Sequence, residues 1–98
     1  MTITRYREGS KLTMILDGWL DTANAPKLYD ELGARLNGVT HLVLDMKQLQ
    51  YLSTAGLRVV LAAQKQMNRQ GRLTVTHVSQ AVMEVLEITG FVDILDIQ

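Results

Sequence analysis

Two adjacent hydroxyl residues, Ser53 and Thr54, stand just before Gly56 and have the clearest chemical potential in the sequence. A helical pattern follows them, so either hydroxyl can accept a hydrogen bond from the unpaired backbone amides of the first turn and act as the N-cap. The same place is the positive end of the helix dipole, where free amides favour an anion such as phosphate. The pair therefore predicts a polar, anion-tolerant site at the start of a helix.

An apolar strand pattern leads to these hydroxyls. The run from Leu42 to Leu44 is closed by Asp45, as expected of a strand that is buried on both faces. A polar connection over residues 47–50 follows. Beyond Gly56, apolar residues recur at helical spacing at Leu57, Val60, Leu61 and Met67. We therefore expect the hydroxyls to lie between a buried strand and an amphipathic helix.

The N-terminal part of the chain predicts a β-hairpin. Residues 2–8 and 11–19 have strand character, and the second of these runs places Leu12, Met14 and Leu16 on one face by alternation. A short link containing Gly9 joins the two runs. Such a link makes an antiparallel pairing the simplest arrangement.

Helices and further strands follow in alternation. A first helix is expected to begin between residues 22 and 26, because the proline at the end of that range fits only the first turn. Residues 72–77 alternate as a strand. Ser79 then caps a third helix, which Gly90 stops. Residues 91–97 are apolar and form either a short last strand or a packed tail.

This order, β-β-α-β-α-β-α with an optional final strand, predicts one α/β domain over residues 1–98. Strand-helix-strand crossovers are right-handed and place parallel strands in one sheet. We therefore expect a mixed sheet of four to five strands with three main helices. A chain of 98 residues has room for one hydrophobic core and little else.

Asp45, followed by the run YLSTAGLRVVL from Tyr51 to Leu61, resembles the signature of STAS domains. The similarity is greatest to the stand-alone anti-sigma factor antagonists of bacteria. In that family a partner kinase phosphorylates the hydroxyl two residues before the glycine, which implies Thr54 here, with Ser53 as the alternative. The usual acceptor in the family is serine, so threonine is a departure from its pattern.

The resemblance also implies a binding surface around the phosphorylation site. Gly18, Leu20 and Asp21 match a Gly-x-Leu-Asp loop that lies beside the site in the family. The expected partner-binding residues are Trp19, Asp21, Ser53, Thr54, Gly56, Leu57 and Arg58. Asp21 is at least as well explained as a helix cap.

Two of these residues have an alternative explanation, and so has a pair of cations further along the helix. By strand parity Trp19 points away from the Leu12 face, so it is either an exposed binding anchor or a cover for the other face of the sheet. Arg58 lies one turn from Thr54 and is placed to contact a partner or a phosphate. Lys65 and Arg69 follow on the same side, as part of a basic strip or as a solvated helix face.

The resemblance implies a phosphorylation-switched binding module. The unmodified protein would sequester an anti-sigma factor with a serine-kinase fold, phosphorylation would end the complex, and a phosphatase would restore it. The alternative is a STAS subunit of a membrane transport or lipid-trafficking complex that needs no phosphorylation. A small nucleotide-binding domain is a third hypothesis.

Composition narrows the classes of function. Ten basic and ten acidic residues cancel, which argues against sequence-independent binding to nucleic acid. The chain has no cysteine, so disulfides and thiolate metal sites are excluded. No apolar run approaches the length of a bilayer span and no secretory signal is visible, so we expect a cytoplasmic protein without membrane insertion.

No arrangement of residues predicts an active site. His41 and His77 lie at strand ends without a carboxylate or nucleophile at motif spacing. Gly33 and Gly38 have the spacing of a phosphate loop, but Val39 occupies the position of the required lysine. We therefore expect no enzymatic activity, no catalytic residue, no metal and no cofactor.

Overall fold

The longest strand, β2 (Lys11–Leu20), organises the sheet. In the computed structural model, which describes all residues 1–98, β2 pairs antiparallel with β1 (Thr2–Glu8) and parallel with β3 (His41–Asp45). β3 in turn pairs parallel with β5 (Arg72–Thr76), and β5 with the short β6 (Asp96–Ile97). The main sheet therefore has the order β1-β2-β3-β5-β6, and the predicted N-terminal hairpin is confirmed.

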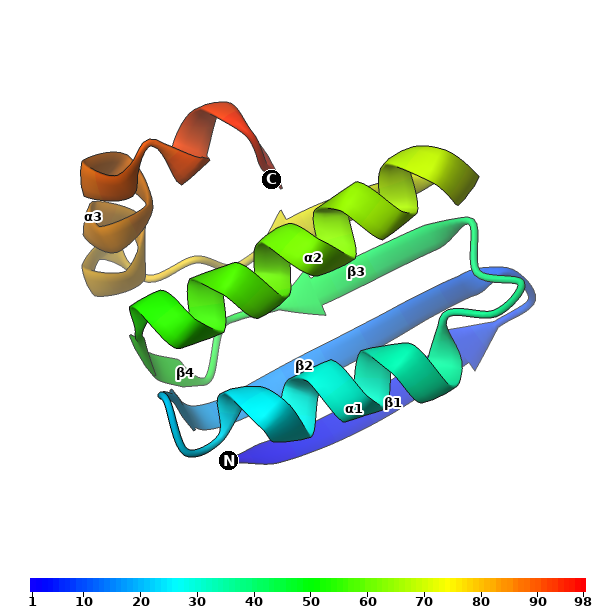
Figure 1. Cartoon of the computed structure of the whole chain (residues 1–98), viewed down its shortest axis with the longest axis horizontal. Coiled ribbons are helices and arrows are strands. Elements are labelled where there is room, and N and C mark those ends of the chain that lie inside the picture. Colours follow the sequence, from blue (N-terminus) through cyan, green and yellow to red (C-terminus); the bar gives the residue numbers. More distant parts are fainter.

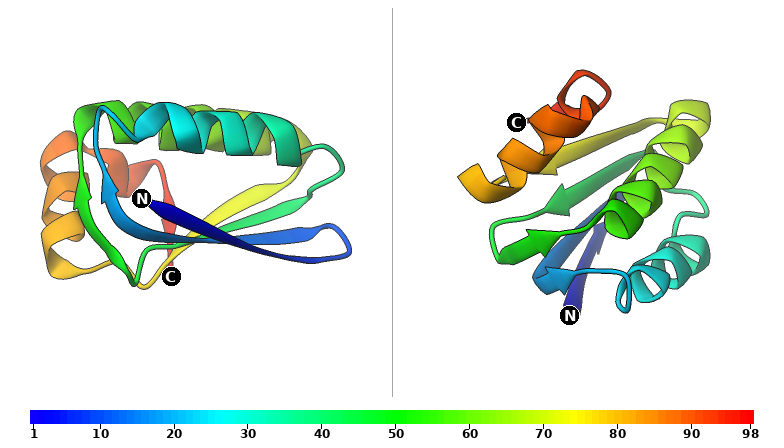
Figure 2. Two further views of the ribbon diagram at one scale, coloured as in Figure 1. Left: turned by 90° about the horizontal axis from the view of Figure 1, so that it is seen from below. Right: turned by 60° about the vertical axis from the view of Figure 1, so that its left-hand side comes forward.

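Two parallel crossover helices cover one face of this sheet. α1 (Ala25–Arg35) follows β2 and begins within the predicted range, with Pro26 in its first turn. α2 (Thr54–Gln70) precedes β5 and lies beside α1 on the same side of the sheet (Figure 1; Figure 2, left). Both connections are crossovers between parallel strands. None of the helices combines the length and apolarity that crossing a membrane requires.

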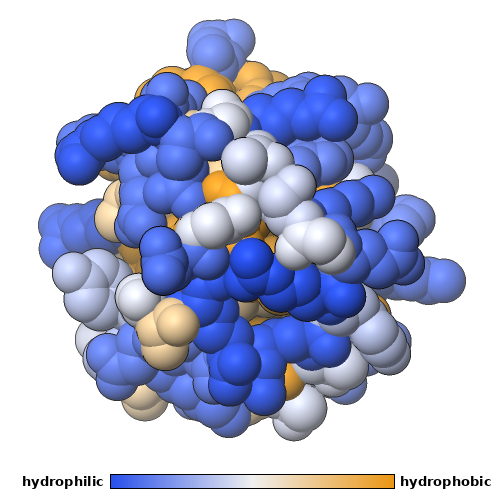
Figure 3. Space-filling view, turned by 90° about the vertical axis from the view of Figure 1, so that its right-hand side faces the viewer, coloured by the Kyte–Doolittle hydropathy of each residue, from blue (hydrophilic) through white to orange (hydrophobic).

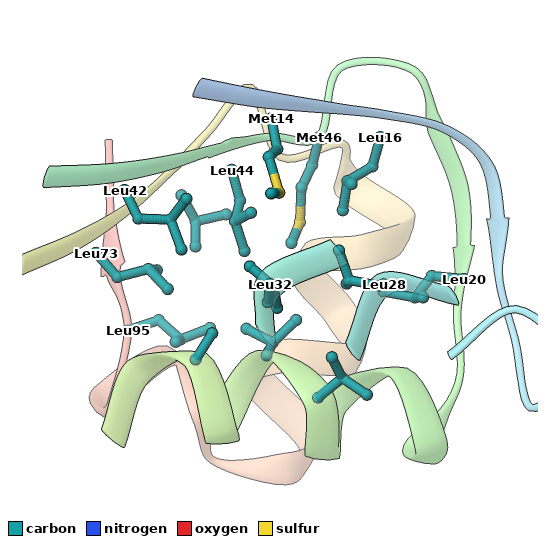
Figure 4. Close-up of a cluster of buried hydrophobic side chains, with 14 of the residues drawn as sticks. Met14, Leu16, Leu20, Leu28, Leu32, Leu42, Leu44, Met46, Leu73 and Leu95 are labelled. Atoms are coloured by element: carbon teal, nitrogen blue, oxygen red, sulfur yellow. The ribbon is translucent and has the colours of Figure 1, made fainter. Parts of the chain in front are cut away.

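The hydrophobic core lies between this helix pair and the sheet. Met14, Leu16, Leu42 and Leu44 extend from β2 and β3 toward the helices, where Leu28 and Leu32 of α1 meet them (Figure 4). Complete burial of one such side chain stabilises the fold by about 1.5–3 kcal/mol. The other face of the sheet has no helix on it (Figure 2, left); Thr13 and Val43 on this face are only partly buried, while Thr74 on β5 is buried.

A sixth strand, β4 (Leu49–Leu52), replaces part of the polar connection expected over residues 47–50. It pairs in parallel with the end of β2, beyond a register shift between Gly18 and Trp19. Leu49 and Leu52 are buried, which anchors the strand to the core. The sheet therefore contains six strands, while the predicted fold class, a mixed sheet with three main helices, is confirmed.

The C-terminal part forms a third helix and a short final strand. α3 (Gln80–Thr89) is capped by Ser79, whose hydroxyl accepts a hydrogen bond from the Val82 amide at 3.2 Å. Gly90 ends the helix in the left-handed conformation, with φ +80°. A 3-10 turn, η1 (Phe91–Asp93), then leads to β6. α3 packs against β4 at one end of the sheet rather than over its face (Figure 1).

Candidate functional site

The candidate site lies at the edge of the sheet where β2, β4 and β5 end and the three helices begin. Loops at this edge of a parallel sheet collect function in many folds. Ser53 is tied to this edge because its backbone N–H donates to the carbonyl oxygen of Leu20 at 2.9 Å. The start of α2 is therefore held directly against the end of β2.

The two hydroxyls differ in their surroundings. Ser53 is the N-cap of α2: its Oγ accepts a hydrogen bond from the Gly56 amide at 3.1 Å, and the residue is half-buried. Thr54 is the first residue of the helix and is exposed. Its hydroxyl takes part in none of the side-chain hydrogen bonds of the chain. One hydroxyl is thus occupied by capping, and the other is free for a partner.

Gly56 and Leu57 are buried and set the position of the helix. A Cβ atom on Gly56 would lie 2.7 Å from Cγ and 2.9 Å from the carbonyl oxygen of Leu20, so only glycine permits this approach of α2 to β2. Leu57 belongs to the hydrophobic core. Both residues hold the start of α2 in position, which places the hydroxyls at the surface. Neither residue contributes a side chain to that surface.

Asp21 shapes the loop between β2 and α1. One carboxylate oxygen, Oδ1, accepts a hydrogen bond from the Asn24 amide at 2.9 Å, and the Asp21 carbonyl accepts from the Ala25 amide at 2.8 Å. Asn24 occupies the N-cap position, and its side-chain Nδ2 donates to the carbonyl oxygen of Trp19 at 2.9 Å. Asp21 is therefore not the N-cap of α1, but its carboxylate stabilises the turn that precedes the helix, and its second carboxylate oxygen is left without a partner in the chain.

Trp19 forms an exposed aromatic pair with Tyr51, its register partner on β4. The ring centroids are 5.2 Å apart with the planes tilted by 37°. The Trp19 Nε1 donates to Oε1 of Gln50 at 3.2 Å. The exposed fractions are 53% for Trp19 and 45% for Tyr51, so the pair forms an amphipathic surface feature.

Sequence analysis did not single out Tyr51 and Gln50 as site residues. Gln50 was expected in the polar connection, and Tyr51 entered only as part of the family signature, so no strand parity was available to place them. The two residues that flank them, Leu49 and Leu52, are buried. Residues three apart point to opposite faces of a strand, so alternation alone does not predict that both residues between them are exposed.

Arg58 lies one turn after Thr54 and is exposed, as are Lys65 and Arg69 further along α2. The ion pairs of the chain join Glu31 to Arg5 and Arg35, and Asp45 to His77. Arg58, Lys65 and Arg69 therefore have no acidic partner. The outer face of α2 is therefore a strip of uncompensated positive charge that begins beside the hydroxyls.

Asp45 stabilises the turn at the end of β3. Its Oδ1 accepts a hydrogen bond from the Lys47 amide at 3.0 Å and lies 3.1 Å from Nδ1 of His77. His77 adopts a left-handed backbone conformation with φ +56°, which is uncommon for a residue with a side chain. The pair joins the ends of β3 and β5 at the same edge as Ser53.

His41 lies away from this edge, on the face of the sheet that no helix covers. Its Nε2 is 3.0 Å from the Thr74 hydroxyl. Burial lowers the pKa of His41, and the positive charges of Arg72 and Lys11 lower it further. His41 and His77 do not come together, and no three His, Asp or Glu side chains are grouped as metal ligands.

The opposite end of the molecule lacks such a surface. Figure 3 shows the end at which α2 finishes, and hydrophilic side chains cover most of it. The exposed aromatic pair and the free hydroxyl are thus grouped at the other end. That grouping is the arrangement expected of a protein-binding site, since aromatic residues dominate binding energy at interfaces.

Comparison with known proteins assigns the family. A family model described as "Mlab, STAS domain" matches residues 3–96. BtrV of Bordetella bronchiseptica, which is named as an anti-sigma factor antagonist, is 39% identical over 99 residues, covering 99% of this chain and 85% of BtrV. The chain belongs to the anti-sigma factor antagonist family of STAS domains. The family resemblance predicted from the sequence is confirmed.

Solved structures show that this STAS domain shares the fold of anti-sigma factor antagonists. An anti-sigma factor antagonist from Mycobacterium paratuberculosis superposes with a TM-score of 0.88 at 20% identity, covering 98% of this chain and 83% of that one. The Bacillus protein SpoIIAA in its phosphorylated form gives a TM-score of 0.77 at 15% identity, covering 99% of this chain and 91% of that one.

Proposed function

We propose that this protein is a cytoplasmic anti-sigma factor antagonist that is switched by phosphorylation of Thr54. In its unmodified form it binds and sequesters an anti-sigma factor with a serine-kinase fold, which releases the sigma factor for transcription. The partner kinase transfers a phosphate from ATP to Thr54 and the complex dissociates. A phosphatase then restores the binding form.

The observation that carries this proposal is the difference between the two hydroxyls. Ser53 Oγ is half-buried and engaged with the Gly56 amide, so phosphorylation there would remove the helix cap. Thr54 is exposed and its hydroxyl is free. A kinase needs access to the hydroxyl that attacks the phosphorus atom. SpoIIAA, which has the same fold, exists in a phosphorylated form.

The surroundings of Thr54 support a switch that changes binding and leaves the fold intact. A phosphate there would lie at the N-terminus of α2, where the helix dipole favours an anion, and one turn from the Arg58 guanidinium. It would add about 1.5 to 2 negative charges at neutral pH. At a partner surface shaped for an uncharged hydroxyl, the same charge must be desolvated, which weakens the complex.

The partner-binding surface combines the aromatic pair with the polar groups around Thr54. Trp19 and Tyr51 supply apolar area with polar edges, and Arg58 and the free oxygen of Asp21 supply charge. Aromatic residues and arginine are the residue types that most often dominate binding energy at interfaces. Gly56, Leu57 and the Ser53 cap act by holding this surface in place.

The decisive experiment is labelling by the cognate kinase-type anti-sigma factor. We expect Thr54→Ala to abolish incorporation of phosphate, while Ser53→Ala retains it, because the free hydroxyl is unchanged in that variant. Binding of the unmodified protein is measured alongside by calorimetry. Labelling of Ser53 with Thr54 left unmodified would overturn the assignment. Absence of both labelling and binding would favour a constitutive subunit of a transport or lipid-trafficking complex.

A further inference from the structure

A groove between α1 and α2 is a second surface feature that the proposed function does not use. Its volume is about 480 Å³, and small residues create the hollow: Gly33 on α1 faces Ala62 and Ala63 on α2. A Cβ atom added to Gly33 would meet no atom within 4 Å, so the space above it is open. The exposed ring of Tyr29 forms part of the wall.

The groove carries positive charge on one rim. Lys65 and Arg69 line it, and no acidic residue does. Neither cation is paired with a carboxylate in the chain. The occupant that fits is therefore an apolar side chain that is accompanied by negative charge.

The outer face of α3 has this composition. Ile88 is 86% exposed, the highest exposed fraction among the large apolar residues of the chain. Glu84 lies one turn before it and Glu87 directly precedes it, and both are exposed. Neither glutamate takes part in an ion pair. Because residues four apart share one helix face, Glu84 and Ile88 point in the same direction.

The distribution of charge strengthens this match. Residues 46–72, which include α2, contain the cations Lys47, Arg58, Lys65, Arg69 and Arg72 and no acidic residue. Residues 73–98, which include α3, contain Glu84, Glu87, Asp93 and Asp96 and no cation. The balanced net charge of the chain thus conceals an uneven distribution: α2 carries only cations and α3 only carboxylates. Surfaces of opposite charge steer association and fix its register.

We propose that α3 of one copy docks in the α1–α2 groove of a second copy. Ile88 enters the hollow over Gly33 and Ala62, while Glu84 and Glu87 face Lys65 and Arg69. α3 cannot occupy the groove of its own molecule, because α2 lies between the groove and the C-terminal region (Figure 1). The contact joins two different surfaces, so it is heterologous and propagates into short chains of molecules.

Sedimentation velocity on the isolated full chain tests this proposal from micromolar to millimolar concentration. We expect reversible, concentration-dependent association that weakens at least tenfold between 50 mM and 500 mM salt, because the charge pairs are exposed to solvent. A monomer at every concentration in low salt would overturn the proposal. The measurement needs no anti-sigma factor, so its outcome is independent of the proposed function.

Charge reversal identifies the two surfaces. The double variants K65E/R69E and E84K/E87K should each remain monomeric, because like charges then face one another. An equimolar mixture of the two should associate, since every groove meets a patch of opposite charge. A charge reversal elsewhere, Lys47→Glu, serves as the control and should leave association unchanged. A mixture that stays monomeric, or double variants that associate like the wild type, would refute the assignment.

Filling the groove separates docking from folding. Gly33→Leu should raise the melting temperature, because leucine favours a helix over glycine and the added side chain meets open space. The same side chain would occupy the hollow and should weaken self-association at least tenfold. Ile88→Ser, at an exposed position, should weaken it to a similar extent. Association that persists in both variants would show that another surface is responsible.

Discussion

The hydroxyl oxygen of Ser53 accepts a hydrogen bond from the backbone amide of Gly56 at 3.1 Å. This one bond distinguishes the two neighbouring hydroxyls at the start of α2, because it engages Ser53 in capping and leaves Thr54 exposed. We predict that Ser53→Ala lowers the free energy of unfolding by about 1 kcal/mol, the usual contribution of a serine cap. Urea denaturation gives this value directly.

Thr54→Ala is the matched control for the capping prediction. Its side chain makes no hydrogen bond in the structure, so we expect the free energy of unfolding to change by less than about 0.5 kcal/mol. Equal destabilisation by the two substitutions would contradict the separation of roles between cap and free hydroxyl.

Gly56→Ala should destabilise the protein, although alanine favours a helix over glycine. The added Cβ would lie 2.7 Å from Cγ and 2.9 Å from the carbonyl oxygen of Leu20, so α2 must move away from β2. We expect a loss of about 1–3 kcal/mol, as for other cases of overpacking. Gly33→Ala, where the new methyl group meets open space, should stabilise by about 0.5–1 kcal/mol. Thermal melting of the two variants tests whether packing or helix propensity determines the change in stability at each glycine.

Phosphorylation of Thr54 should weaken binding to the anti-sigma factor and leave the melting temperature almost unchanged. The phosphate is accommodated locally by the N-terminus of α2, but it must be desolvated at the partner surface. Thr54→Glu should reproduce the effect only in part, because a carboxylate has less charge and fewer acceptor oxygens than a phosphate. A drop of many degrees in melting temperature would show instead that the switch acts by local unfolding.

Tyr51→Ala should weaken binding to the anti-sigma factor by about 1–2 kcal/mol, within the range found for aromatic residues at interfaces. The same substitution should alter the fluorescence of Trp19, the only tryptophan, since the two ring centroids are 5.2 Å apart. Tyr29→Ala, on an exposed residue of α1, is the control and should affect neither quantity. Binding unchanged by Tyr51→Ala would exclude the aromatic pair from the interface.

His41 should make the protein less stable below neutral pH. Burial lowers its pKa in the folded state below the value of about 6.5 expected in the unfolded chain. The unfolded chain then binds the proton more tightly, so the contribution of neutral His41 is complete above about pH 6.5 and is lost as the pH falls toward the folded-state pKa. Urea denaturation between pH 5 and 8 should give a shallower pH dependence for His41→Gln. Identical profiles would contradict this role.

The sequence by itself determined the elements whose signals are local. The alternation of Leu12, Met14 and Leu16 and the link at Gly9 predict the hairpin, because strand parity and turn chemistry act over a few residues. Ser79 and Gly90 likewise predict both ends of α3, since a cap and a left-handed glycine act within one turn. The Ser53–Leu61 segment carries enough of the family pattern to predict the family as well.

Only the tertiary structure decided which hydroxyl is free and which aromatic residues share the site. Both Ser53 and Thr54 have the chemistry of a cap, and the hydrogen bond from Ser53 N–H to the Leu20 carbonyl on β2 places Ser53 in that position. β4 is four residues long and exists because the end of β2 offers it a partner beyond the register shift at Gly18. A strand this short has too few residues for a periodic pattern. Its pairing energy comes from a segment about thirty residues away in sequence, so the chain must fold before Tyr51 meets Trp19.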